Sequence, residues 1–127
     1  MNKPIDFETA VYLKGIYREN TLQKYCENGV LTTVATNNTL PAPTYLELLD
    51  WLSQRFMFVS VVKAKVNEQK YKYIISDFKC TLNETIIFDR WQDAFKAGIK
   101  EATKLYIDYI NKKAVSNYSL FISNLFF

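Results

Sequence analysis

Residues 56–75 read FMFVSVVKAKVNEQKYKYII. The part from 56 to 62 is apolar on both faces of an extended chain, which is typical of an inner strand of a sheet. From Lys63 polar and apolar residues alternate, and after Asn67 and Glu68 the alternation resumes as far as Ile75. Alternation with a period of two on both sides of a short polar break predicts a β-hairpin.

Two registers of this hairpin are open, and both bring lysines together. A two-residue loop at 67–68 pairs Lys65 with Lys70 and Lys63 with Lys72, whereas a four-residue loop at 67–70 pairs Lys65 with Lys72. Because like charges directly opposite one another are destabilising, an anion such as a nucleic-acid phosphate would relieve the cluster. The alternative is a solvated edge that discourages aggregation. In both registers the face with the lysines is opposite to the face on which Val62, Ala64, Val66, Tyr71 and Tyr73 lie.

A helix is expected immediately before this hairpin. Residues 44–47, TYLE, match the capping box, in which Thr44 and Glu47 satisfy two backbone donors reciprocally. Trp51 lies off the centre of the apolar stripe that follows, which predicts a second contact for its ring. The stripe consists of Tyr45, Leu48, Leu49, Leu52 and Phe56.

The longest helix is expected to begin at the N-cap Asp89 and to run to Lys113. Gly98 costs about 1 kcal/mol relative to Ala inside a helix, so we expect it to allow close approach to the sheet, over Trp51 or the strand that contains Phe58. A row of lysines at i, i+4 spacing is either the wet face of this helix or an extension of the hairpin lysines. The row consists of Lys96, Lys100 and Lys104, and the expected apolar face consists of Trp91, Phe95, Gly98, Ile99, Ala102, Leu105, Tyr106 and Tyr109.

The first part of the chain carries weaker local signals. Residues 6–17 are expected to form a helix with Asp6 as its N-cap. Glu27-Asn28-Gly29 predicts the turn of a hairpin over 21–36, because Asn and Gly tolerate positive φ. Residues 37–43, with two prolines, are expected to form a loop.

These elements predict an α+β fold in the order α-ββ-α-ββ-α. One small antiparallel sheet of two hairpins would be covered on one face by three helices. We expect residues 1–113 to form one domain. Residues 114–127 form a separate aromatic tail without any charged residue.

The tail cannot stay exposed without becoming an aggregation risk. It is therefore expected either to fold back onto its own core or to dock on a protein partner, for instance by strand addition. The residues that would dock are Tyr118, Leu120, Phe121, Ile122, Leu125, Phe126 and Phe127.

Composition excludes several kinds of chemistry. The chain has no histidine, so Ser-His-Asp catalysis, Cys-His catalysis and His-ligated zinc are excluded. It has two cysteines, Cys26 and Cys80, in no C-x-x-C motif, and a reactive Cys26 would need a cationic neighbour such as Lys24. The pairs Asp89 with Asp93 and Glu47 with Asp50 have structural explanations as caps and first-turn acids. We expect no enzyme, no cofactor and no metal site.

The charge balance and the beginning of the chain indicate neither a membrane nor an obligatory nucleic-acid partner. The net charge is +3, from 16 basic and 13 acidic residues. The first residues are not followed by an apolar run of the kind found in signal peptides, so no signal peptide is expected. No apolar stretch approaches the roughly 18–20 residues of a membrane helix. A cytoplasmic location is expected.

The order of motifs resembles a group of small, uncharacterised phage and prophage proteins of gut bacteria. The motifs are Phe7-Glu8-Thr9-Ala10, Glu27-Asn28-Gly29, Ala42-Pro43-Thr44 with Trp51-Leu52, and Ala94 through Gly98-Ile99 to Glu101-Ala102. The resemblance covers roughly residues 5–110 and implies a phage or mobile-element origin with an α+β fold. It transfers no catalytic residue. The shortened stretch before Glu27 and the uncharged tail depart from the pattern.

The sequence therefore predicts a non-enzymatic interaction protein in the host cytoplasm or the virion, whose partner is itself, a virion component or a host factor. The alternative is a small nucleic-acid-binding module. Its candidate contacts are Lys63, Lys65, Lys70, Lys72, Lys96, Lys100 and Lys104.

Overall fold

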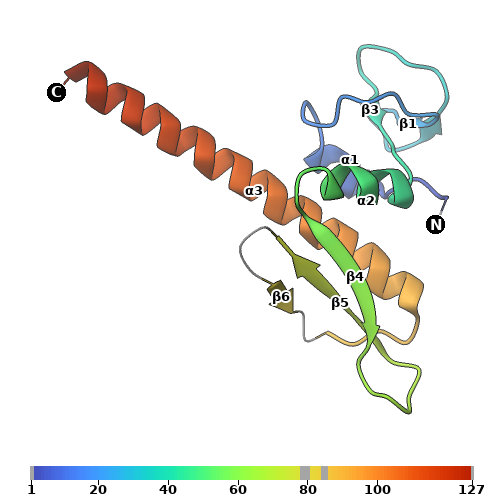
Figure 1. Ribbon diagram of the computed structural model, residues 1–127. Helices are drawn as coiled ribbons and strands as arrows, with labels where there is room; N and C mark the ends of the chain where they lie inside the picture. The colour runs from blue at the N-terminus through green and yellow to red at the C-terminus, as the bar shows by residue number, and fades with distance from the viewer. Residues whose placement is uncertain (1, 78–80, 84–85, 127) are drawn as a thin grey trace.

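The computed structural model describes residues 2–77, 81–83 and 86–126, and its longest element is one helix that passes between two small sheets (Figure 1). The first part of the chain contains α1 (Phe7–Tyr12), β1 (Lys24–Tyr25), β2 (Leu31–Thr32), β3 (Leu40–Pro41) and α2 (Tyr45–Ser53). The second part contains β4 (Phe58–Lys63), β5 (Tyr71–Ser76), β6 (Thr81–Asn83) and α3 (Trp91–Phe126). The expected α+β class is confirmed.

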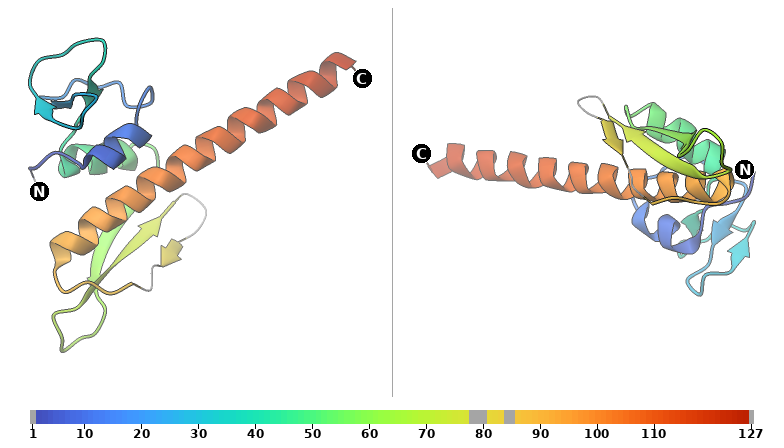
Figure 2. Two further views of the ribbon diagram at one scale, coloured as in Figure 1. Left: turned by 180° about the vertical axis from the view of Figure 1, so that it is seen from behind. Right: turned by 90° about the horizontal axis from the view of Figure 1, so that it is seen from below.

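The strands form two antiparallel sheets, with the orders β2-β1-β3 and β4-β5-β6, and not the single sheet expected from the sequence. The two sheets lie on opposite sides of α3, so the helix keeps their edges apart (Figures 1 and 2). Each sheet also has a third strand. β3 lies within the segment predicted as a loop, where Leu40 pairs with Tyr25 and Pro41 with Lys24.

The local signals for the caps of α1 and α2 and for the turn at Gly29 are confirmed. The backbone N–H of Thr9 donates to Oδ1 of Asp6 at 2.8 Å, which caps α1. The capping box of α2 is complete: Glu47 N donates to Thr44 Oγ1 at 3.2 Å, and Thr44 N donates to Glu47 Oε1 at 3.0 Å. Gly29 has φ +82° in the turn between β1 and β2.

Both short helices end earlier than their apolar patterns indicate. α1 ends at Tyr12 instead of Tyr17, and Gly15 has φ +76° in the turns that follow. α2 ends at Ser53, and Phe56 has φ +62° just before β4. A positive φ cannot continue a right-handed helix. The apolar side chains beyond these ends are therefore positioned by turns.

The register of β4 and β5 differs from both expected registers. Lys63 pairs with Tyr71, and Ala64 N donates to the carbonyl of Lys70 at 2.8 Å, so the connection spans residues 65–69. A shift of one residue turns every side chain of a strand to the other face. Lys63 thus lies on the face of Tyr71, and Lys72 lies opposite Val62 on the other face.

Packing against α3 explains this register. Val59 pairs with Ile75 and Val61 with Tyr73, so four apolar side chains share the face toward the helix. The expected registers would have placed the hydroxyl of Ser60 on that face instead. The observed pairing leaves Ser60 on the outer face, where it is exposed.

β4 is an edge strand among the described residues, not the inner strand expected. It pairs with β5 alone, and Phe58 on its outer face is 48% exposed. Its two apolar faces have different explanations. One face packs on α3, and the other belongs to the outer face of the sheet, which no described element covers (Figure 1).

Close approach of α3 to this sheet depends on Gly98. A Cβ atom at this position would lie 2.8 Å from Cγ1 of Val59 and 2.9 Å from Cβ of Tyr73. The expected approach to the strand of Phe58 is confirmed. On the other side α3 packs against α1 and α2. The largest fully buried side chains include Ile5, Leu13, Leu48, Trp51, Leu52, Ile75 and Ile99.

The two ends of α3 differ from the expectation. The helix begins at Trp91, so Asp89 lies outside its N-cap position, and the carboxylate of Asp89 pairs with Lys70 instead. Trp91 and Tyr109 belong to the expected apolar face but are 41% and 57% exposed. At the other end α3 continues without a break past residue 113 to Phe126. Its backbone extends away from both sheets and does not fold back onto them (Figures 1 and 2).

Replacement of Gly98 by Ala should lower the free energy of unfolding, because overpacking typically costs about 1–3 kcal/mol. Intrinsic helix propensity acts in the opposite direction, since Ala is favoured over Gly by about 1 kcal/mol. Denaturant unfolding of Gly98→Ala measures the net change in the free energy of unfolding. The control is Asn111→Ala at an exposed site on the same helix, which should be neutral or slightly stabilising. A stabilised Gly98→Ala would contradict the close approach.

Candidate functional site

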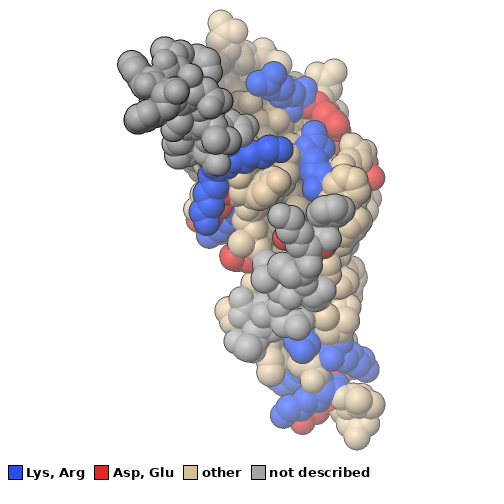
Figure 3. Space-filling view, turned by 60° about the vertical axis from the view of Figure 1, so that its left-hand side comes forward, with Lys and Arg blue, Asp and Glu red and all other residues tan. Residues whose placement is uncertain are grey.

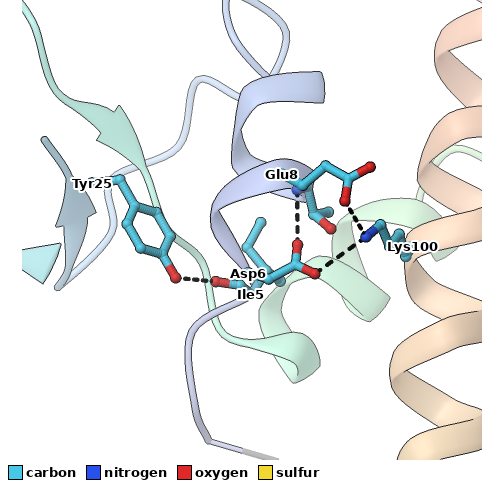
Figure 4. A network of polar contacts seen from close by, with 6 residues as sticks. Ile5, Asp6, Glu8, Tyr25 and Lys100 are labelled. Carbon is cyan, nitrogen blue, oxygen red and sulfur yellow. Dashed lines mark hydrogen bonds and ion pairs between the residues drawn. The ribbon is translucent and has the colours of Figure 1, made fainter. Parts of the chain in front are cut away.

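Lys100 joins α3 to the beginning of α1. Its Nζ lies 2.5 Å from Oε2 of Glu8 and 3.4 Å from Oδ2 of Asp6 (Figure 4). The second oxygen of Asp6 caps α1, so one carboxylate both begins the short helix and holds the long one. In the same region the hydroxyl of Tyr25 donates to the carbonyl of Ile5 at 2.7 Å, which connects β1 to the N-terminal segment (Figure 4).

The pKa values of these groups move in the directions that an ion pair requires. Burial alone would raise the pKa of Asp6, but the hydrogen bonds from Thr9 and the charge of Lys100 outweigh burial and hold it below 3.8. The hydrogen bond to Glu8 raises the pKa of Lys100 above 10.5. Both groups therefore remain charged near neutral pH.

The neighbouring lysines of the row also contact the N-terminal helices. Nζ of Lys96 lies 5.6 Å from the ring centroid of Tyr45, at the start of α2. Nζ of Lys104 lies 5.3 Å from the ring centroid of Tyr12, at the end of α1. Cation–π contacts at such distances are worth about 0.5–1 kcal/mol near a surface. The row is thus neither a solvated face nor an extension of the hairpin lysines. Its three members lie where α3 packs against the two short helices.

The hairpin lysines lie apart from this row. Nζ of Lys70 pairs with Oδ1 of Asp89, and this hydrogen bond raises the pKa of Lys70 above its ordinary value. Lys63, Lys65 and Lys72 make no ion pair within the described part of the chain, but Lys72 lies on the face opposite to Lys63. Figure 3 shows basic side chains in two groups at opposite ends of the visible face.

Trp51 has the second contact that its position in the sequence predicts. It is only 2% exposed, and its ring centroid lies 5.4 Å from those of both Tyr17 and Tyr106. The guanidinium of Arg55 lies 3.9 Å from the centroid of the same ring. Burial, with the nearby charge of Glu19, raises the pKa of Tyr17 to about 12. The cluster is an aromatic connection between α2 and α3, with the cation of Arg55 stacked on its central ring.

An open hollow of about 340 Å³ beside the first hairpin is lined by Cys26, Glu27, Asn28, Thr36, Asn38 and Thr39. The cation that would activate Cys26 is directed elsewhere, because Nζ of Lys24 donates to the carbonyl of Thr21 at 2.6 Å. Cys80 lies outside the described residues. Within the described ranges no group of three or more Cys, Asp or Glu side chains is placed to hold a metal ion.

The candidate carboxylates are engaged in separate structural contacts. Glu47 completes the capping box of α2. Oδ2 of Asp50 accepts a hydrogen bond from Nε2 of Gln54 at 3.0 Å. Asp89 pairs with Lys70 and is not brought together with the acids of α2. Among the described residues, Asp89 and Glu47 therefore have separate structural partners, and Asp89 lies outside the helix that would have placed it one turn from Asp93.

The C-terminal part of α3 is the remaining candidate site. At about 100° per residue, most apolar positions of the tail fall on one helical face. By this period position 115 shares the apolar face, although it is not among the expected docking residues, whereas position 120 falls on the side of positions 116, 119 and 123. Phe127 lies outside the described residues. The apolar positions are Ala114, Val115, Tyr118, Phe121, Ile122, Leu125 and Phe126.

No family model matches this chain, and no curated protein or solved structure is significantly similar to it. Among the described residues no helix is both long and apolar enough to cross a membrane.

Removal of the Lys100 charge should lower the stability of the domain. We expect Lys100→Met to reduce the free energy of unfolding by about 0.2–1 kcal/mol at pH 7, because the ion pair is partly exposed. Since the folded pKa of Asp6 is depressed, its contribution is present above pH 3.8 and is lost as the pH falls through the folded pKa. The difference between wild type and variant should therefore shrink in acid. Denaturant unfolding as a function of pH measures this difference, with Lys65→Met in the exposed connection between β4 and β5 as the control. An equal loss of stability in both variants would contradict a stabilising contact between Lys100 and the two acids at the start of α1.

Proposed function

We propose that this chain is a non-enzymatic interaction protein that acts through protein–protein contacts, with the C-terminal part of α3 as its docking element. The observation that carries the proposal is the continuation of α3 to Phe126 beyond both sheets, with no charged residue after Lys113. A phage or mobile-element origin and a role in the host cytoplasm or virion follow from the resemblance and belong to the same proposal.

Helix energetics support a docking role. Isolated helices shorter than about 12–15 residues are marginal in water even when they are rich in Ala. Residues 114–127 are instead rich in Ser, Asn and aromatic residues, whose helix propensities are lower, and they have no charged i, i+4 pair. A covering partner would stabilise this part of α3 by burying its apolar face.

The positions of the lysines favour this function over nucleic-acid binding. Lys70, Lys96, Lys100 and Lys104 all contact groups of the same chain. A phosphate backbone would have to compete with those partners. The hairpin is left with Lys63 and Lys72, which lie on opposite faces of the sheet, and with Lys65, which lies in the connection between the strands.

A photo-cross-linking amino acid can test the docking element in the cells that produce the chain. At position 118, on the apolar face, it should yield a discrete cross-linked product, with a second copy or with another protein. At position 116, on the polar face, the same probe should yield little. Leu125→Asp should abolish the product from position 118, whereas Ser123→Asp should preserve it. Equal products from both probes, or none from position 118, would contradict the proposal.

A further inference from the structure

We propose that two copies of this chain pair through the C-terminal parts of α3, with the two helices antiparallel. This inference rests on the proposed function and names the partner as a second copy. It follows from the continuity of one helical face, the spacing of the apolar positions and the distribution of charge along the helix.

The apolar face of the tail continues a face that is already a packing surface. Lys100 and Lys104 contact Glu8 and Tyr12 of α1, and Ile107, one turn further on, is buried. Past this point no described element covers α3 (Figure 2). The helical phase of the covered face leads to positions 114 and 118, so the same face continues past the described elements that pack on α3.

The tail carries the spacing of a two-helix seam. Val115, Tyr118, Ile122 and Leu125 follow one another at intervals of three, four and three residues, the alternation of the a and d positions of a coiled coil. Ala114, Phe121 and Phe126 flank this seam. Alternation of three and four keeps an apolar stripe on one side of a helix, as in amphipathic helices generally, and a stripe of this width fits against one partner helix.

The seam is symmetric under reversal of direction. Positions 115 and 125 are equidistant from position 120, as are positions 118 and 122. An antiparallel two-fold pair therefore sets Val115 opposite Leu125 of the second copy and Tyr118 opposite Ile122 of the second copy. Each contact occurs twice, as a closed two-fold interface requires.

Charge selects the antiparallel direction. Lys112 and Lys113 are exposed and precede the uncharged tail. A parallel pair would bring these lysines of both copies together. The antiparallel pair places them beside the last turn of the second copy's helix, where the helix dipole is negative and no basic residue occurs.

The area available suits a dimer. Each buried aromatic residue contributes about 150–250 Å², so Tyr118, Phe121 and Phe126 alone supply roughly 450–750 Å² per copy. A stable interface buries about 800 Å² per partner, which the aliphatic seam residues complete. A membrane surface is a poorer match, because helices that bind there carry Lys and Arg on the polar face, and this one carries Ser and Asn.

Sedimentation equilibrium of the full chain at tens of micromolar tests the inference. We expect a mass about twice 14.9 kDa. Val115→Lys with Leu125→Lys should weaken association at least about tenfold, because like charges meet across the seam. Val115→Lys with Leu125→Glu should associate more tightly than that variant, because opposite charges meet only in the antiparallel pair. Ser116→Lys with Ser123→Glu carries the same charges on the polar face and should match wild type.

Three results would overturn the inference. A monomeric wild type excludes the second copy, and addition of anionic lipid vesicles to that monomer would show whether a membrane replaces it. Equal weakening of the Lys–Lys and Lys–Glu variants excludes the antiparallel register. Loss of association in the polar-face control excludes the seam. A monomer that still yields a cross-link from position 118 to another protein would overturn this inference and leave the proposed function intact.

Discussion

The packing of α3 on β4 and β5 is the contact on which the rest of the structure depends. Val59 and Tyr73 occupy the space that a side chain at position 98 would need, so the close approach of the helix to the sheet requires glycine at this position. This contact determines which face of the hairpin is inside and therefore its register. It also leaves the other side of α3 to pack against α1 and α2, where Trp51 and Lys100 join the two parts of the chain.

Two lysine patterns that are alike in the sequence have different roles in the structure. At i, i+4 spacing on a long helix, charged residues are usually solvated. Here the row on α3 contacts the rings of Tyr45 and Tyr12 and the acids at the start of α1. Spacing along one helix carries no information about what a second helix presents to it. The sequence also does not indicate that this row is separate from the hairpin lysines, because the separation depends on how α1 and α2 cover α3.

For residues 114–127, the secondary structure determines how the composition is interpreted. The absence of charge after Lys113 marks it as a candidate interaction segment from sequence alone. Only continuation of α3 as a helix assigns its residues to faces, because strand addition would have given a period of two. With a helical period, position 115 shares a face of α3 with positions 118, 122 and 125, position 120 falls on the opposite side, and the spacing of three and four residues becomes visible.

The sequence was sufficient for the caps of α1 and α2 but not of α3, and for the Gly29 turn, the α+β class, the approach of the helix at Gly98 and the second contact of Trp51. These features arise from interactions within a few residues or from periodicity, which one sequence records directly. The division into two sheets, the edge position of β4 and the register of its hairpin were decided by tertiary structure. The physical reason is that a hairpin of alternating residues accepts registers one residue apart at little local cost. Only burial of Val59, Val61, Tyr73 and Ile75 against α3 distinguishes them.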